Sequence, residues 1–169
     1  MDVIKAGQAR EDTTFLDVGC NSKLCCSVHF HLRLDISLVG TDVRKLVFDG
    51  YPAKNIYACD LHTQFLELGY KLYRDKDTCE ITFFPADILS FSPVPLANSS
   101  GGPMSPLETF RDRVTHLYCG LFFHLFDEQG QEDIAKRLAA LLDRRPGSLI
   151  FGTHVGSAAA GPTLTPASR

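Results

Sequence analysis

The sequence has no tryptophan, only two methionines and no long apolar run. A membrane-spanning helix needs about 18 or more consecutive apolar residues, so we expect neither a transmembrane segment nor a membrane partner. No secretory signal pattern opens the chain, which favours a cytoplasmic location. An excess of one charge is also lacking: 17 lysines and arginines stand against 20 aspartates and glutamates, a net charge of −3. Nucleic acid is therefore not an expected partner either.

Two familiar phosphate-binding loops are missing as well. After Gly19 the next glycine is Gly40, so neither Gly-x-Gly-x-x-Gly nor a Walker-type loop follows the first apolar run. The six cysteines are not spaced like the disulfide framework of a small secreted domain. We therefore expect reduced thiols and no dinucleotide-binding loop.

Short apolar runs alternate with amphipathic stretches between residues 15 and 153. The runs predict strands at 15–18, 55–59, 80–84, 113–118 and 148–153. Apolar spacings of three and four predict helices at 42–48, 63–74 and 132–142. Alternating strands and helices predict an α/β fold: a Rossmann-like, doubly wound, mostly parallel sheet of about five strands.

One α/β domain is expected over residues 1–156. The apolar faces of its two longer helices comprise Phe65, Leu68 and Leu72 in 63–74, and Ile134, Leu138 and Leu141 in 132–142. Residues 90–106 are rich in Ser, Pro and Gly, which predicts a flexible loop. Residues 157–169 are small and polar, which predicts a disordered tail.

Acidic residues end three of the expected strands. Asp17 and Gly19 close the first strand, Asp60 the second, and Asp87 follows the third. Parallel strands receive ligands at their carboxyl ends, where an acid can accept hydrogen bonds from a ribose diol, and Asp87 with its apolar neighbour Ile88 can meet an adenine. A single such acid is usually a helix cap or a turn residue. Three at equivalent positions favour a site for a nucleotide-like cofactor.

Several segments together resemble a known family. They are 15–20, 40–50, 55–61, 65–77, 85–89, 122–126 and 146–152. As a set they resemble class I S-adenosylmethionine-dependent methyltransferases, and among these the small methyltransferases of fungal secondary-metabolite clusters, including meroterpenoid pathways. The resemblance covers about residues 5–20 and 40–156, and implies the class I methyltransferase core as the fold.

The resemblance also implies roles for individual residues. The cofactor, S-adenosyl-L-methionine, would be bound at its methionine end by Asp17, Gly19 and Gly40, at its ribose and adenine by Asp60 and Leu61, and at the adenine edge by Asp87 and Ile88. Tyr118 and Cys119 would face the transferred methyl group. Phe122 and His124 would lie near the methyl acceptor.

Residues 21–39 have no counterpart in that family, in which the glycine turn runs almost directly into the helix near Asp42. One hypothesis is that they are translated from an unspliced intron, which the mature transcript would test. This segment carries soft metal ligands at Cys25, Cys26, His29 and His31. Because Cys-Cys with His-x-His lacks the usual zinc-site spacing, no metal site is expected.

The family has more chain before the first strand and further strands after the fifth, so the sequence is expected to be truncated at both ends. Two functions follow. The three acids favour methyl transfer to a carboxylate or hydroxyl oxygen of a small, largely apolar secondary metabolite. The insertion and the missing ends favour a non-catalytic, truncated or mis-spliced relative with little or no cofactor binding. The acceptor, the pathway and the oligomeric state are left open.

A hydroxyl acceptor needs a base to remove its proton, whereas a carboxylate is already a nucleophile at neutral pH. His124 is the candidate base, and its alternative role is to pack at a helix start beneath the aromatic run. Phe122, Phe123 and Phe126 suit an apolar substrate or fill the core. His116, inside an expected strand, is interpreted as structural.

Overall fold

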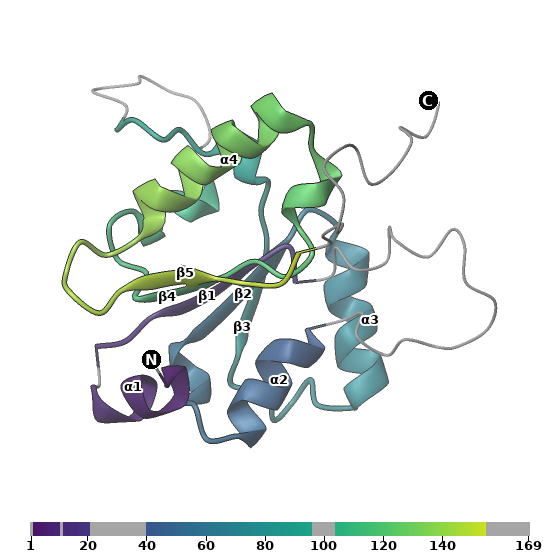
Figure 1. Ribbon diagram of the computed structural model, residues 1–169. Coiled ribbons are helices and arrows are strands. Elements are labelled where there is room, and N and C mark those ends of the chain that lie inside the picture. Colours follow the sequence, from purple (N-terminus) through teal and green to yellow (C-terminus); the bar gives the residue numbers. More distant parts are fainter. Residues whose placement is uncertain (1, 11, 21–39, 96–103, 155–169) are drawn as a thin grey trace.

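A five-stranded parallel sheet forms the centre of the protein (Figure 1). The computed structural model describes residues 2–10, 12–20, 40–95 and 104–154. In the sheet order β3-β2-β1-β4-β5, the strands are Thr82–Pro85, Ile56–Asp60, Phe15–Val18, His116–Tyr118 and Leu149–Phe151. Every neighbouring pair is parallel. The predicted α/β, Rossmann-like fold class is confirmed.

Helices cover both faces of this sheet. In the described residues the α-helices are α1 (Val3–Ala9), α2 (Thr41–Phe48), α3 (Thr63–Tyr73) and α4 (Glu128–Leu141). Short 3-10 turns, η2 to η5, occupy Ala53–Asn55, Ile88–Ser90, Pro106–Phe110 and Phe123–Leu125. Figure 1 shows α4 on one side of the sheet and α1 and α2 on the other. A sheet with helices on both faces is doubly wound, as the strand–helix alternation predicts.

Two separate cores follow from the alternation of side chains along each strand. Towards α4, Leu16 and Val18 of β1 join a buried cluster with Ile134. Towards α2, Phe15 joins a second cluster with Val43. Because β1 is central and its four residues are buried, both faces of this strand contribute apolar surface to a core.

The start of α4 differs from the prediction. The helix begins at Glu128 rather than at residue 132, because Asp127 caps it by accepting a 2.8 Å hydrogen bond from the backbone N–H of Gly130. Its predicted inward side chains are fully buried, which confirms the apolar face; they are Ile134, Leu138 and Leu141.

The apolar face predicted for α3 is wrong at its two leucines, whereas Phe65 is half-buried. Leu68 and Leu72 are 49% and 50% exposed, whereas Leu66 and Gly69 are buried. Both pairs have the spacing of one helix face, so periodicity alone does not choose between them. Gly69 places backbone rather than a side chain at the buried face, and the leucine pair faces away from the sheet.

The first helix, α1, was not predicted. Asp2 caps it by accepting a 3.3 Å hydrogen bond from the backbone N–H of Lys5. Its buried residue is Gly7, where a Cβ would lie 2.1 Å from the ring of Tyr51. The helix therefore docks through a glycine, and a seven-residue segment with a glycine contact shows no apolar periodicity in the sequence.

Most of the later strands are shorter than predicted. Strand β3 begins at Thr82 rather than at residue 80, β4 at His116 rather than at 113, and β5 runs from Leu149 only to Phe151. Before β4, Val114 forms an isolated bridge with Leu142. The apolar runs thus continue past the residues that take part in the ladder.

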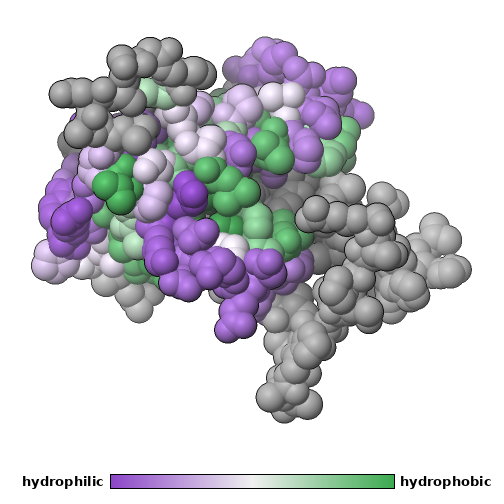
Figure 2. Space-filling model, turned by 90° about the horizontal axis from the view of Figure 1, so that it is seen from above, coloured by the Kyte–Doolittle hydropathy of each residue, from purple (hydrophilic) through white to green (hydrophobic). Residues whose placement is uncertain are grey.

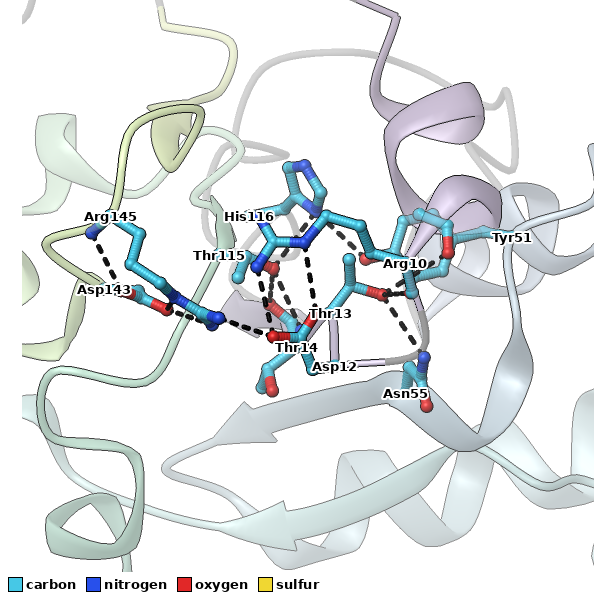
Figure 3. Close-up of polar contacts among 11 residues, drawn as sticks. Arg10, Asp12, Thr13, Thr14, Tyr51, Asn55, Thr115, His116, Asp143 and Arg145 are labelled. Atoms are coloured by element: carbon cyan, nitrogen blue, oxygen red, sulfur yellow. Dashed lines mark hydrogen bonds and ion pairs between the residues drawn. The ribbon is translucent and has the colours of Figure 1, made fainter.

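Polar side chains fasten the amino-terminal edge of the sheet (Figure 3). The hydroxyl of Thr115, just before β4, donates a 2.9 Å hydrogen bond to the carbonyl of Thr14 and accepts one from the N–H of the same residue. Buried His116 lies 3.0 Å from the hydroxyl of Tyr51 through Nδ1. Arg145 pairs with both Asp143 and Asp12, and so joins the approaches to β5 and β1. Side-chain contacts thus occupy the amino-terminal edge of the sheet, whereas a cavity lies at the carboxyl-terminal edge.

Some predictions lie outside the described residues. These are the insertion at 21–39 with its cysteines and histidines, the middle of the loop at 96–103, and the tail at 157–169. The flanks of the loop are η3 and η4. Across the described ranges, no helix has the length and apolar character needed to cross a membrane.

Candidate cofactor site

A cavity of about 390 Å³ lies at the carboxyl ends of the strands. Six residues of the predicted site line it: Gly19, Asp60, Leu61, Asp87, Ile88 and Phe122. They come from β1, β2, and the turns that follow β3 and β4. The topology therefore brings together side chains that are up to about a hundred positions apart in the sequence, as expected for parallel strands with equivalent ends.

Gly19 forms the turn that ends β1. Its φ of +76° is a conformation that favours glycine. The N–H groups of Gly19 and Cys20 both donate to the carbonyl of Cys59, at 3.0 and 3.1 Å. The turn is thus fastened to β2 and leaves backbone, without a side chain, at the wall of the cavity.

Asp60 is the last residue of β2 and is only 6% exposed. Its Oδ1 accepts a 3.0 Å hydrogen bond from the N–H of His62, and its carbonyl accepts one from Ala86. A carboxylate has about four acceptor positions, and Asp60 lines the cavity, so it is of the right chemistry to accept from hydroxyl donors there. Next to it, Leu61 is 60% exposed and adds apolar surface to the same wall.

Asp87 and Ile88, in the turn after β3, also line the cavity. The carboxylate of Asp87 caps η3 by accepting a 2.8 Å hydrogen bond from the N–H of Leu89. Ile88 is 5% exposed and belongs to the core on the α4 side. Asp87 is thus a cap and a wall residue at once.

Other lining residues were not predicted as site residues. They are Val18, His62, Phe65, Ala86, Leu89 and Leu125; Phe126, also in the lining, was expected to suit an apolar substrate or to fill the core. Those in α3 and η5 carry apolar side chains that periodicity assigns equally well to the core. Figure 2 shows hydrophobic surface exposed among hydrophilic side chains on the face that carries α4. The cavity is therefore mainly apolar, with two carboxylates at its walls.

The remaining predicted site residues do not line this cavity. Buried Asp17 is opposite Tyr118 in the register of β1 and β4. The hydroxyl of Tyr118 donates a 3.0 Å hydrogen bond to Asp42 in the first turn of α2. These last two side chains line a second cavity of about 350 Å³ on the α2 side, together with residues of α1.

Cys119 and Gly40 are held by protein contacts. Cys119 is buried, and burial, assisted by the charge of Asp17, raises the pKa of its thiol to about 11. Gly40 has a φ of +69° and precedes α2, and a Cβ there would lie 2.7 Å from the ring of Phe83. Neither residue lines the cavity that contains Gly19.

His124 lies in η5, and its ring centroid is 6.0 Å from that of His154. Burial lowers the pKa of His124, and the nearby His154 lowers it further. Its sequence neighbours on the wall, Phe122 and Phe126, contact each other with ring centroids 5.4 Å apart. The imidazole therefore sits beside the apolar wall rather than in it.

Comparison with curated proteins finds similar chains among fungal methyltransferases. The chain is 36% identical over 147 residues to the O-methyltransferase atr3 of Stereocaulon alpinum, which is 87% of this chain and 34% of that protein. It is 33% identical over 153 residues to the O-methyltransferase phiE of a fungal species, 90% and 42% of the two chains. It is 34% identical over 141 residues to the Asnovolin E/Chermesin D methyltransferase nvfJ of Aspergillus novofumigatus, 83% and 41%.

No protein-family model matches the chain. The chain spans between 34% and 42% of the length of these three relatives. Its own matched part covers most of its length, and the parallel order β3-β2-β1-β4-β5 of its sheet fits a Rossmann-like methyltransferase core. The chain is therefore a relative of fungal secondary-metabolite O-methyltransferases, with the α/β core expected for them.

Proposed function

We propose that this protein transfers a methyl group from S-adenosylmethionine to a carboxylate or hydroxyl oxygen of a small, largely apolar secondary metabolite. The observation that carries the proposal is the convergence of Gly19, Asp60, Leu61, Asp87 and Ile88 on one cavity at the strand ends. The proposed setting is the cytoplasm, with a small molecule as partner and without nucleic acid or membrane.

The chemistry of the cavity suits the adenosine part of this cofactor. Its volume of about 390 Å³ lies within the range of about 300 to 1,000 Å³ usual for small-molecule sites. Asp60 offers acceptor positions for ribose hydroxyls, and Asp87 offers them for an exocyclic amine. Leu61, Ile88 and Phe65 supply apolar contacts for a flat ring. The residues present therefore fit the group.

The contribution of the protein to the reaction is alignment and exclusion of water. S-adenosylmethionine, when bound, supplies an electrophilic methyl group attached to sulfur. Phe122 and Phe126 keep the wall beside η5 apolar. No nucleophilic side chain is needed, because the acceptor oxygen itself attacks the methyl carbon.

His124 is the proposed base for a hydroxyl acceptor. Since burial and His154 lower its pKa, a larger share of its imidazole is neutral near pH 7 and able to accept a proton. A carboxylate acceptor needs no such step, so loss of His124 distinguishes the two acceptors. Rates of a His124→Gln variant should fall for hydroxyl acceptors and stay near wild type for carboxylic acids.

Calorimetric titration of the full chain with S-adenosylmethionine and S-adenosylhomocysteine tests the proposal. Wild type should bind both, and Asp60→Asn should weaken binding by about tenfold or more, because a hydrogen bond to a buried charge is lost. Asp133→Asn, at an exposed position on α4, is the control and should bind like wild type. A folded wild-type chain that binds neither compound would falsify the proposed function.

A further inference from the structure

Arg44 in α2 stands at the centre of a cluster of three aromatic rings. Its guanidinium carbon lies 4.5 Å from the ring centroid of Tyr73, 4.8 Å from that of Phe83 and 5.7 Å from that of Tyr70. Its Nε and Nη2 donate to the two carboxylate oxygens of Asp75, at 2.6 and 3.0 Å. The side chain is 12% exposed. This is a planar cation fixed in position and orientation by four neighbours.

The cluster holds the beginning of α2. Arg44 Nη1 donates to the carbonyl of Gly40 at 3.4 Å. The hydroxyls of Thr41 and Tyr73 are 2.6 Å apart. A Cβ at Gly40 would lie 2.7 Å from the ring of Phe83 and 2.9 Å from Arg44 Nη1. The cluster therefore leaves no space for a side chain at position 40. Residues of α3, of the turn after it and of β3 all contact the first turn of α2.

That helix turn is also tied to the strand ends of the sheet. Asp42 accepts the hydrogen bond of Tyr118, which is the register partner of Asp17 at the end of β1. The first turn of α2 thus has one fixed contact with β4 and a second, independent set with α3 and β3. Removing either the contact with β4 or the contacts with α3 and β3 should let this helix turn move relative to Asp17 and Gly19.

We propose that Arg44 is a positioning residue that fixes the first turn of α2 for binding of the methionine portion of the cofactor. The inference rests on the proposed function and on the position at that portion of the cofactor that the family resemblance implies for Gly40. Arg44 itself need not touch the cofactor. The adenosine portion, held by Asp60 and Asp87 on other elements, should be independent of it.

Arg111 provides a matched control. It also forms a two-point ion pair, donating from Nε and Nη2 to Glu108 at 2.9 and 2.7 Å. It also stacks on a ring, with its guanidinium carbon 4.4 Å from the centroid of Phe91, and its side chain is 14% exposed. The contacts of Arg111 lie with η4 and the α4 side of the sheet, away from α2. Its substitution therefore shows how far the loss of a similar arginine cluster alone affects ligand binding.

The experiment compares two ligands by calorimetry: S-adenosylhomocysteine, which has the amino-acid portion, and 5′-methylthioadenosine, which lacks it. Arg44→Met and Arg44→Lys should each weaken the affinity for S-adenosylhomocysteine by about tenfold. The affinity for methylthioadenosine should stay unchanged. Lysine keeps the charge but loses the two-point geometry, so it should not rescue. Arg111→Met should leave both affinities at wild-type values.

A further variant covers a failure to fold. Tyr73→Phe removes only the hydroxyl contact with Thr41 and should give a smaller loss with the same ligand selectivity. Wild type that binds neither ligand overturns the proposed function itself. If wild type binds both ligands, the proposed function stands. If folded Arg44→Lys or Tyr73→Phe then weakens the binding of both ligands equally, or of neither, only the role of Arg44 is overturned.

Discussion

The hydroxyl of Tyr118 donates a 3.0 Å hydrogen bond to Asp42 Oδ2, and so joins the end of β4 to the first turn of α2. These residues are 76 positions apart in the sequence. Tyr118 is the register partner of buried Asp17 on the neighbouring strand β1. This tertiary contact links β4 to the helix turn that follows Gly40, the residue that the resemblance assigns to the methionine end of the cofactor.

Removing this hydroxyl should destabilise the fold. Tyr118→Phe should lower the free energy of unfolding by about 1 to 2 kcal/mol, because a hydrogen bond to a charged acceptor is lost. Urea denaturation followed by circular dichroism measures it. Tyr57→Phe is the control, since the Tyr57 hydroxyl forms no hydrogen bond among the described residues. Equal effects of the two changes would contradict a specific role for the bond.

The same pair should be visible in an alkaline titration. Burial, followed by the charge of Asp42, raises the pKa of Tyr118 to about 12. An unfolded tyrosine ionises near 10, so stability should fall as the pH rises from about 10 towards 12. Asp42→Asn should lower the pKa but leave it above 10, since burial remains. Near-ultraviolet absorbance, with Tyr118→Phe as reference, reports the ionisation; an unchanged pKa in Asp42→Asn would exclude the charge effect.

His116 should make the fold sensitive to mild acid. Burial, aided by the charge of Arg10, lowers the pKa of His116 from its ordinary value of 6.5. As the pH falls below 6.5, the unfolded chain takes up the proton before the folded one, so stability decreases until the folded-state pKa is passed. His116→Gln should flatten the pH dependence of the melting temperature in that window. An unchanged slope in His116→Gln would assign the pH dependence to another group, such as His124, whose pKa burial also lowers.

The two leucine positions of α3 give a direct test of its orientation. Leu66→Ala should cost about 2 to 4 kcal/mol, because a buried leucine leaves a cavity. Leu72→Ala, at a half-exposed position, should change stability by less than about 0.5 kcal/mol. Urea midpoints of the two variants are compared. The reverse order would mean that the helix face predicted from periodicity is the buried one.

Thiol reactivity should follow burial. Cys20, Cys59 and Cys119 are buried, and burial raises the pKa of each thiol. Burial also raises the pKa of Cys79, but this thiol is only partly buried and so is more accessible to a reagent. Iodoacetamide labelling near neutral pH should therefore modify Cys79 first among these four, since the thiolate is the reactive form. Peptide mapping by mass spectrometry at several times gives the order. Early labelling of Cys59 in folded protein would contradict the described packing around β2.

Much of the site was predictable because it lies at strand ends. An apolar run that ends in an acid or a glycine identifies both the strand and its ligand-facing end, so the sequence pattern alone assigns Asp17, Gly19, Asp60 and Asp87 to one edge of the sheet. Of these four, Asp17 does not line the cavity. The roles of Gly40, Tyr118, Cys119 and His124 were implied by the resemblance, and none of the four lines the shared cavity. Their roles stay predictions.

The order of strands and helices, and hence the parallel sheet with acids at its strand ends, follows from the amino-acid sequence alone. These are local properties of apolar runs and turn residues. Three other features depend on the folded chain: which face of α3 is buried, where α1 docks, and the meeting of Arg44 with Asp75 and three rings. They result from the shape of surfaces contributed by distant segments, and no local periodicity encodes that shape.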